Sequence, residues 1–368
     1  MSTQESSSLI DLLDNNIQSS SDFSRFLEAK ARSMGFPLNG SFELTPLCNL
    51  DCKMCYVHLS DEQIKDESLL TKDQWLSLMK QAIDAGMMYA SLTGGECLTY
   101  PEFDDIYLFL LSNAVRVSIL TNGLLLSPER LQFFKTHRPS SIQITLYGCD
   151  NDSYENTTGH RVFEQVFRNL LSALSSGLSV KVGITPNRYM GNADEQLMEL
   201  LIKNRIPFSL NSQLYAARPE TGRMISEFDQ PIEDYIRLRN LYIKQREIDI
   251  PTECTNHVTP ILPPIGIKCG AGNSGFNIDW RGKMYACAML PDIFSFPLEE
   301  GFIAAWKRIH TEAQKYPNPT ECRTCKYSPL CTKCVAAHRS GAEPGHANPR
   351  ICEQAKHIAE LYSHHKET

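Results

Sequence analysis

The stretch SFELTPLCNLDCKMCY, residues 41–56, joins a short alternating run to three closely spaced cysteines. Residues 41–45 alternate between polar and apolar side chains, which is the period of a half-buried strand. Cys48, Cys52 and Cys55 follow this strand, with three and then two residues between them. We therefore expect the three thiols on a loop that leaves the carboxyl end of a strand.

Five more strands are expected downstream, with helices between them. The strand predictions are residues 89–93, 115–121, 142–146, 180–185 and 207–210. Helix starts are indicated by Thr71 with Gln74, by Ser127 before a proline, and by Asn192 with Glu195. Such alternation implies right-handed crossovers and a parallel sheet, either doubly wound or curled into a barrel. Six repeats would make an α/β partial (β/α)6 barrel of TIM-like form, whose active site lies at the carboxyl ends of the strands.

The chain is expected to divide into four parts. They are a polar N-terminal segment, the barrel, a proline-rich linker and a cysteine-rich domain, at residues 1–37, 38–247, 248–268 and 269–368. In the first part, residues 9–13 and 23–31 are predicted to be helical, and residues 232–247 form the last helix of the second. The fourth part shows turns and little periodicity, so we expect its fold to depend on bound metal.

Composition excludes several classes of protein. The chain has 368 residues, 42% of them hydrophobic and 21% charged, which excludes a disordered or fibrous protein. The net charge of −7 argues against nucleic acid or an anionic membrane as the main partner. The start of the chain lacks the pattern of a signal peptide, and no apolar run approaches about 18 residues. We therefore expect a cytoplasmic location.

Thirteen cysteines are unusual for such a chain, because a reducing compartment turns clustered thiols into metal ligands or catalysts. A four-iron cluster normally takes four thiolates, so the three at residues 48–55 would leave one iron open. An open coordination position is typical of a catalytic metal site. The alternatives for these three residues are a zinc site or buried thiols.

A second group of cysteines lies near the C-terminal end. A hairpin is predicted from residues 276–280 and 283–287 around Arg281 and Gly282. Two C-x2-C pairs could form a zinc ribbon, but the remaining cysteines would then be unexplained. Seven cysteines are one short of two four-cysteine clusters, and Cys254 is a doubtful eighth. The seven are Cys269, Cys287, Cys322, Cys325, Cys331, Cys334 and Cys352.

The cysteine loop, with Thr93-Gly94-Gly95-Glu96 at the end of the second strand, resembles the radical S-adenosylmethionine (radical SAM) superfamily. The resemblance implies a [4Fe-4S] cluster whose open iron chelates the methionine part of S-adenosylmethionine. It also implies that the Gly-Gly-Glu strand end binds the cofactor amine, since glycines let the backbone approach and a glutamate accepts from ammonium. The residues implied to bind the cofactor are Tyr56, Gly94, Gly95, Glu96, Asn122 and Thr145, the last through the ribose.

Three positions depart from the family pattern. Met54 stands where an aromatic residue is common, Cys97 where proline is common, and Tyr147 where many relatives are acidic. Cys97 and Tyr147 are weak candidates for a catalytic role, although Cys97 and Cys149 are more readily explained as small buried hydrophobes. Other polar candidates near the site are Glu43, His58, Asn187, Arg188 and Tyr189.

The C-terminal third resembles the SPASM extension, a domain with two auxiliary clusters that is attached to radical enzymes. The resemblance implies that one auxiliary [4Fe-4S] cluster uses Cys269, Cys287 and Cys334, with Cys254 as a doubtful fourth ligand. The other would use Cys322, Cys325, Cys331 and Cys352. One spacing departs from the family, because only Thr332 and Lys333 separate Cys331 from Cys334, where three residues are usual.

The two resemblances together imply an oxidoreductase that modifies a peptide. An external one-electron donor of flavodoxin or ferredoxin type would reduce the first cluster, and the resulting 5′-deoxyadenosyl radical would abstract hydrogen from a ribosomally made peptide. The product would be an oxidised residue or a thioether or carbon–carbon crosslink. Residues 1–37 are too few for a winged-helix leader-binding domain, so a separate leader-recognition protein or direct binding in the barrel is expected.

Three other functions are alternatives to this one. Sulfatase-maturing relatives carry an aspartate directly after the hairpin cysteine, where this chain has Ala288. Dehydrogenation of a small molecule is another possibility. A non-enzymatic electron carrier or zinc-binding module is disfavoured by the open three-cysteine site and the Gly-Gly-Glu strand end.

Overall fold

Nine strands form one sheet in the computed structural model, which describes residues 20–65, 69–211, 214–215, 218, 221, 231–245, 263–331 and 333–364. The first six are β1 (Asn39–Glu43), β2 (Tyr89–Thr93), β3 (Arg116–Thr121), β4 (Ser141–Leu146), β5 (Val180–Ile184) and β6 (Phe208–Leu210). The last three are β7 (Gly275–Ile278), β8 (Met284–Cys287) and β9 (Leu290–Ser295). All six strands predicted for the barrel, and both arms of the predicted hairpin, are confirmed to within about two residues at their ends.

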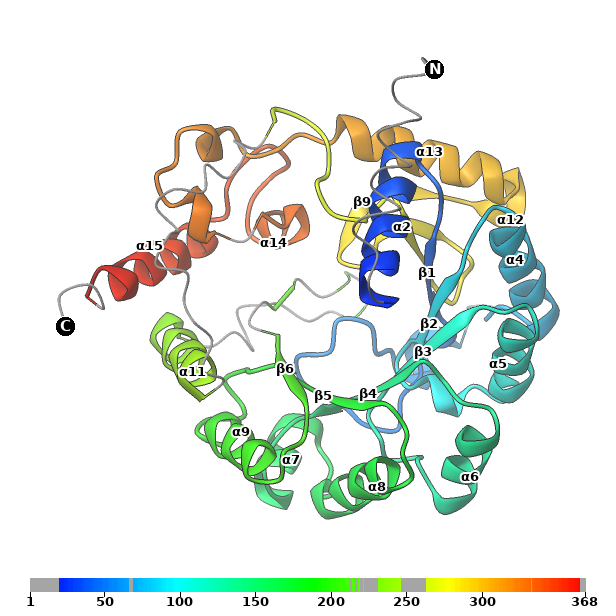
Figure 1. Ribbon diagram of the computed structural model, residues 1–368, viewed down its shortest axis with the longest axis horizontal. Helices are drawn as coiled ribbons and strands as arrows, with labels where there is room; N and C mark the ends of the chain where they lie inside the picture. Colours follow the sequence, from blue (N-terminus) through cyan, green and yellow to red (C-terminus); the bar gives the residue numbers. More distant parts are fainter. Residues whose placement is uncertain are drawn as a thin grey trace.

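The strands are ordered β6-β5-β4-β3-β2-β1-β7-β8-β9. The first six run parallel to their neighbours, and β7 is also parallel to β1, while β7, β8 and β9 are antiparallel. Helices lie around the outside of the curved sheet (Figure 1). They include α4 (Lys72–Asp84), α5 (Phe103–Ser112), α6 (Pro128–Thr136), α8 (Phe163–Ser175), α9 (Ala193–Lys203) and α11 (Ile232–Gln245). This is the partial (β/α)6 barrel that the alternating pattern predicts.

Local sequence explains where these helices begin. Thr71 and Gln74 form the predicted capping box at the start of α4, and the Ser127 side chain accepts from the Arg130 N–H at the start of α6. Asn192 is the N-cap of α9, but its side chain makes no capping hydrogen bond. The helix signals therefore place the starts correctly, and in α9 packing against the barrel replaces the cap.

The core of the barrel continues into the C-terminal region. Phe42 of β1 meets Trp75 of α4 and Phe276 of β7 edge to face, with ring centroids 6.1 and 5.9 Å apart. Phe276 then meets Phe302 and Trp306 of α13 (Phe302–Lys315) at 5.2 and 6.2 Å. One layer of aromatic side chains thus joins the barrel to the hairpin and its helix.

The expectation of little periodicity beyond residue 269 is wrong for α13. This helix buries Phe302, Ala305, Trp306, Ile309 and Ala313 along one face, with the spacing of an amphipathic helix. A further helix, α15 (Pro349–His364), closes the region. The segment from β7 to α13 therefore folds by burying apolar side chains against the barrel, and only the turns beyond it are poor in such contacts.

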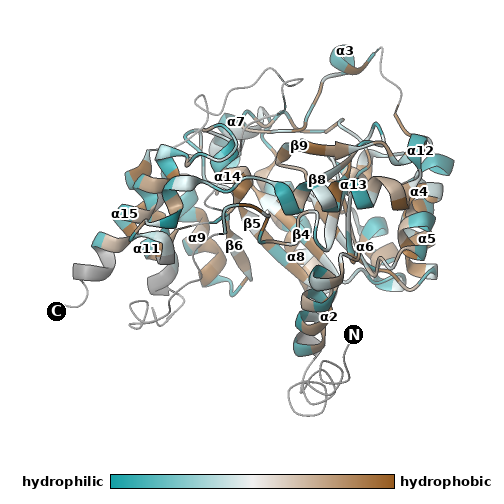
Figure 2. Ribbon diagram, turned by 90° about the horizontal axis from the view of Figure 1, so that it is seen from above, coloured by the Kyte–Doolittle hydropathy of each residue, from teal (hydrophilic) through white to brown (hydrophobic). Residues whose placement is uncertain are grey.

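The two ends of the barrel differ (Figure 2). At the carboxyl ends of the strands lie α3 (Asp61–Ile64) and α7 (Asn151–Thr158), and α2 (Ser20–Met34) lies at the opposite end. Helix α2 confirms the helix predicted at residues 23–31. Residues 9–13 lie outside the described residues, as does most of the predicted linker, so both stay predictions.

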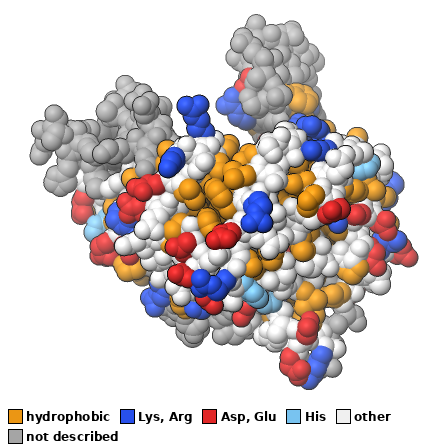
Figure 3. Space-filling model, turned by 90° about the horizontal axis from the view of Figure 1, so that it is seen from below, with side chains coloured by type: hydrophobic (Ala, Val, Ile, Leu, Met, Phe, Trp, Pro, Cys, Tyr) orange, Lys and Arg blue, Asp and Glu red, His pale blue; other side chains and the backbone are white. Residues whose placement is uncertain are grey.

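The outer surface carries both charged and hydrophobic side chains. In the face formed by the helices at the bottom of Figure 1, hydrophobic side chains gather in the middle, with lysine, arginine and acidic side chains around them (Figure 3). Within the described part of the chain, no helix has the length and apolar character needed to cross a membrane.

Candidate active site

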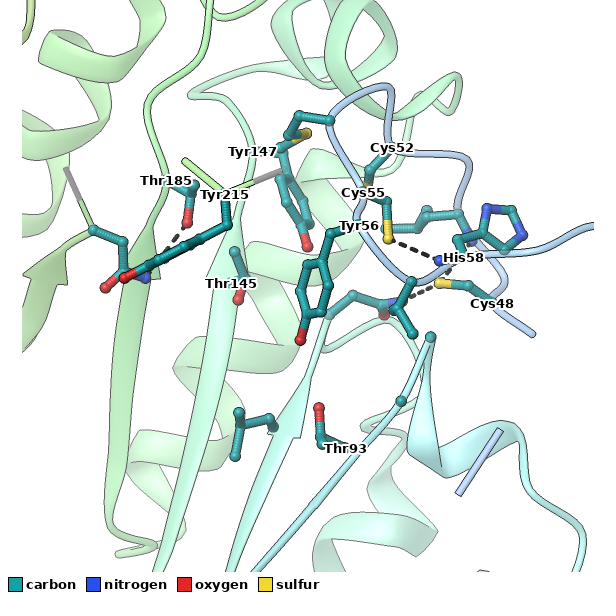
Figure 4. Close-up of a pocket in the computed structure, with 18 of the residues that line it drawn as sticks. Cys48, Cys52, Cys55, Tyr56, His58, Thr93, Thr145, Tyr147, Thr185 and Tyr215 are labelled. Atoms are coloured by element: carbon teal, nitrogen blue, oxygen red, sulfur yellow. Dashed lines mark hydrogen bonds between the residues drawn. The ribbon is translucent and has the colours of Figure 1, made fainter. Parts of the chain in front are cut away.

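A cavity of about 540 Å³ opens at the carboxyl ends of the barrel strands, a size typical of ligand sites. Its wall combines the cysteine loop after β1 with the ends of β2 to β5 and the chain that follows β6. Three cysteines lie on one side, Thr185 and Tyr215 on the other, and the rings of Tyr56 and Tyr147 lie between them (Figure 4). The site is therefore assembled from six successive segments of the barrel.

The cysteine loop is held by its own backbone. The Leu50 N–H points at the Cys48 sulfur at 3.4 Å, and the His58 N–H points at the Cys55 sulfur at 3.2 Å. The N–H groups of Asp51 and Lys53 donate to the carbonyls of Thr158 and Thr157 at the end of α7, each at 3.0 Å. N–H groups aimed at sulfur favour the thiolate form that a metal ligand requires. Burial raises the pKa of the Cys48 thiol to about 12, so a metal would have to displace its proton.

Gly94 and Gly95 are required by a close approach of two backbone segments. A Cβ at Gly94 would lie 2.4 Å from the Thr45 carbonyl oxygen, and one at Gly95 would lie 2.3 Å from that of Leu47. The Gly95 and Glu96 N–H groups donate to these two carbonyls at 2.7 and 2.9 Å. The close backbone approach that the two glycines allow is therefore to Thr45 and Leu47, where the cysteine loop begins. Both glycines also line the cavity.

Glu96 is fully buried and is not among the residues that line the cavity. Its carboxylate accepts from the Leu98 N–H at 3.0 Å, the Thr121 hydroxyl at 2.9 Å and the Asn122 N–H at 2.7 Å. Burial raises the pKa of Glu96 in spite of these donors. The carboxylate joins the ends of β2 and β3, and its role toward a cofactor amine stays a prediction.

Asn122 lines the cavity and is bonded to the cysteine loop. Its side-chain NH2 donates to Asn49 Oδ1 at 2.6 Å and lies 3.7 Å from the Cys48 sulfur, while its oxygen accepts from the Leu124 N–H at 3.0 Å. This amide fixes the position of Cys48 relative to the end of β3. The sequence identifies Asn122 as a site residue, but not this contact.

Tyr56, Thr145 and Tyr147 also line the cavity, as the sequence predicts. Burial, followed by the nearby Cys52, Cys55 and Cys48 thiols, raises the pKa of Tyr147 well above its usual value. The ring of Tyr56 lies 5.9 Å from the guanidinium of Arg218, and burial likewise raises its pKa. Both phenols are therefore neutral groups beside the cysteine loop.

The other candidates lie around this site. The Cys97 side chain is fully buried and lies 3.3 Å from the Leu120 carbonyl, so it does not reach the cavity, and the Cys149 sulfur contacts Gln196 at 3.1 Å. His58 lines the cavity, while Glu43 is buried and paired with Arg218 at 2.7 Å.

Asn187 and Tyr189 lie beyond β5. The Asn187 oxygen accepts from the Tyr189 N–H at 3.1 Å, and the Lys53 ammonium lies 4.6 Å from the Tyr189 ring. Neither residue lines the cavity.

The C-terminal cysteines form two groups. Burial and the neighbouring Cys334 and Cys269 thiols raise the pKa of Cys287 to about 11. In the other group, burial and then Cys322, Cys352 and Cys325 raise the pKa of Cys331 to about 12. These groups contain the same residues as the two sets that the SPASM resemblance implies, and the binding of a cluster by each set stays a prediction. Cys254 lies outside the described residues.

None of the described cysteines forms a disulfide. Among the described residues, no three or more His, Cys, Asp or Glu side chains are arranged to hold a single metal ion.

Several wall residues were not identified from the sequence. They are Thr185, Asn211, Tyr215 and Met289, together with Arg218 beneath the wall. Thr185 stands at the end of a predicted strand, so its position was a usable signal. Tyr215 and Arg218 follow β6 in a stretch without periodicity, and Met289 lies in the turn between β8 and β9. Only the folded chain brings these three residues to the cavity.

A family model for the radical SAM superfamily matches residues 42–201. The matched residues include the cysteine loop and the strand ends that line the cavity, so this part of the chain is similar to a radical SAM domain. The cofactors of that family are a [4Fe-4S] cluster and S-adenosylmethionine.

Its relatives include peptide maturation enzymes. The chain is 26% identical over 265 residues to the antilisterial bacteriocin subtilosin biosynthesis protein AlbA of Bacillus subtilis (strain 168), covering 70% of this chain and 56% of AlbA. It thus spans little more than half the length of that relative. It is 24% identical over 357 residues to the mycofactocin maturase MftC of Mycobacterium tuberculosis, covering 90% of this chain and 89% of MftC.

Solved structures show the same fold over almost the whole chain. Streptococcus suis SuiB bound to S-adenosylmethionine has a TM-score of 0.67 at 17% identity, covering 95% of this chain and 87% of SuiB. Native anSMEcpe with bound AdoMet has a TM-score of 0.68 at 15% identity, covering 90% of this chain and 98% of that one. The architecture therefore extends beyond the barrel into the cysteine-rich region.

Proposed function

We propose that this protein is a radical SAM enzyme that modifies a ribosomally made peptide. The observation that carries the proposal is the placement of Cys48, Cys52 and Cys55 on one wall of a 540 Å³ cavity above the strand ends. Tyr215 also lines this cavity, and its hydroxyl lies 3.8 Å from the sulfur of Cys334, which belongs to the second group of cysteines. The relatives named as a bacteriocin biosynthesis protein and a maturase, and a SuiB structure with its precursor peptide, support a peptide substrate.

The three thiols of the cysteine loop fit a [4Fe-4S] cluster with one open iron. When bound, this cluster would supply one electron for the cleavage of S-adenosylmethionine, and the cofactor would supply the radical chemistry that removes hydrogen from the substrate. The protein's own part is to orient the reactants and exclude water. Gly94, Gly95 and Thr145 line the cavity, where the glycine backbone would bind the cofactor amine and Thr145 would bond the ribose.

Two auxiliary [4Fe-4S] clusters form part of the proposal. Cys269, Cys287 and Cys334 would hold the one near the cavity, with Cys254 as the candidate fourth ligand. The other would use Cys322, Cys325, Cys331 and Cys352. An external one-electron donor, a separate protein that recognises the leader peptide, and a cytoplasmic location complete the proposal. The free thiols of the described cysteines support the cytoplasmic location, because a reducing compartment keeps thiols reduced.

Anaerobic reconstitution with iron and sulfide, followed by dithionite and S-adenosylmethionine, tests the proposal. 5′-Deoxyadenosine and peptide masses are followed by mass spectrometry, with and without peptides encoded beside the gene. The expected result is 5′-deoxyadenosine together with a mass loss of about 2 Da in one peptide, the two hydrogens removed by an oxidation or a crosslink. The triple variant Cys48→Ala/Cys52→Ala/Cys55→Ala is the matched control.

The outcomes separate the alternatives. 5′-Deoxyadenosine with unchanged peptides would point to oxidation of a protein or a small molecule. Absence of 5′-deoxyadenosine from protein with intact clusters would overturn the enzyme assignment.

A further inference from the structure

We propose that Tyr215 couples the substrate cavity to the first auxiliary cluster, by donating a hydrogen bond to the Cys334 thiolate that raises the reduction potential of that cluster. The inference rests on the proposed function, because it requires that Cys269, Cys287 and Cys334 hold a cluster. It assigns to this phenol a positioning role that neither the sequence pattern nor the family match identifies.

The position of Tyr215 is the first step of the argument. Its side chain lines the cavity that also holds the three cysteines of the barrel loop, on the side opposite to them (Figure 4). Its hydroxyl lies 3.8 Å from the Cys334 sulfur, and Cys287 and Cys269 are its next electrostatic neighbours among the cysteines. Tyr215 therefore contacts both the substrate space and the C-terminal thiols.

The direction of the hydrogen bond follows from the chemistry of the ligand. In the metal-free protein either the thiol or the phenol could be the donor. A metal-bound cysteine has lost its proton, so the phenol must then donate to sulfur. A donor to a cluster sulfur stabilises the more negative, reduced state, and hydrogen bonds to sulfur are among the factors that set cluster potentials.

A second donor reaches the same group of thiols. Met289 lines the cavity, and its backbone acts to lower the pKa of Cys287, as a donor near the sulfur would. A backbone donor cannot be removed by changing a side chain, whereas the phenol can. The Tyr215 hydroxyl is thus the donor near these cysteines that a side-chain substitution can remove.

Tyr147 provides a matched control in the same cavity. It is also a buried phenol of the wall, but its neighbouring thiols are Cys52, Cys55 and Cys48. Tyr215→Phe and Tyr147→Phe each remove one hydroxyl from the same cavity. Only the first removes a donor to the C-terminal cysteines.

The test is a redox titration of the auxiliary clusters by electron paramagnetic resonance in the full chain. Cys48, Cys52 and Cys55 are replaced by alanine, so that only auxiliary signals remain. Tyr215→Phe is expected to lower the ratio of reduced to oxidised cluster at a fixed potential about tenfold, a shift of about 59 mV to more negative potential for a one-electron couple. Tyr147→Phe is expected to leave the midpoint unchanged.

Each outcome bears on one claim. An unshifted midpoint in Tyr215→Phe, at unchanged iron content, would overturn the role of Tyr215 and leave the proposed function standing. Absence of auxiliary signals and of iron from every variant would overturn the proposed clusters themselves.

A second measurement covers the case in which Tyr215→Phe fails to load iron. Electron–nuclear double resonance of the Tyr215-containing chain should detect a proton coupled to the auxiliary signal that is lost on brief transfer to D2O, before buried amide protons exchange. Absence of that proton would also refute the role of Tyr215.

Discussion

The barrel and the cysteine-rich region hold their cysteines in different ways. The loop with Cys48 is tied to β2 through Gly95 and to α7 through Asp51 and Lys53 by backbone hydrogen bonds, all independent of metal. Cys322 lies in a short 3-10 helix, Thr320–Arg323, that buries no residue, and Cys325 lies in the turn after it. The barrel can therefore present its ligands before a cluster arrives, whereas the turns around the last cysteines need the cluster to hold them.

The largest expected effect separates the two regions by function. The triple variant Cys48→Ala/Cys52→Ala/Cys55→Ala should abolish cleavage of S-adenosylmethionine and reduce iron from about twelve to about eight per chain, because one of three four-iron clusters is lost. Cleavage assays, iron analysis and the auxiliary resonance signals check this together. Persisting cleavage would show that the site has been assigned to the wrong cysteines.

A core substitution tests whether the two regions share one folding unit. Phe276→Ala removes the ring that lies between Phe42 of the barrel and Phe302 of α13, at an expected cost of about 3–5 kcal/mol in the free energy of unfolding. Denaturant unfolding of the metal-free chain measures this cost. Separate transitions for barrel and hairpin in the parent protein would contradict a shared core.

Gly95→Ala tests how closely the cysteine loop is fitted to β2. The added Cβ would meet the Leu47 carbonyl at 2.3 Å, so the expected cost in stability is about 1–3 kcal/mol, with loss of the barrel cluster and retention of the auxiliary ones. Iron content and thermal unfolding are the measurements. The control is Gly275→Ala, whose Cβ would meet its nearest atom at 3.5 Å. Equal losses in both variants would refute the steric argument.

The smallest expected effect is local. Removing metal with a chelator should speed amide exchange in residues 320–334 by about tenfold, equivalent to about 1.4 kcal/mol, while α4 and α13 stay protected. Hydrogen exchange followed by mass spectrometry resolves these segments. Uniform protection across the chain would mean that the turns hold their shape without a cluster.

Local signals were enough to predict the barrel. The strand runs and the capping residues Thr71 and Ser127 act within a few residues of one another, so the sequence alone displays them. Helix α13 also shows a helical period in Phe302, Ala305 and Trp306. The many cysteines around it favoured the prediction that this region depends on bound metal for its fold. That error was avoidable, because burial of a helical face needs no ligand.

Other features depend on the folded chain. The orientation of the Glu96 side chain is set by hydrogen-bond donors at the end of β3. The contact of Tyr215 with Cys334 joins residues that are far apart in the sequence. No spacing rule links such positions. The sequence therefore identifies which residues belong to the site better than it identifies what each side chain touches.

The pairing of β1 affects how the chain folds during its synthesis on the ribosome. This strand bonds to β2 on one side and to β7 on the other, where Asn39 lies opposite Gly275. At about 5–20 residues per second, β7 is synthesised roughly 10–50 s after β1. Until then one edge of β1 is unpaired, and the sheet that carries the cysteine loop is incomplete. The sheet around the cysteine loop is therefore expected to be completed only after β7 has been synthesised, even though the contacts of the loop with β2 and α7 can form earlier.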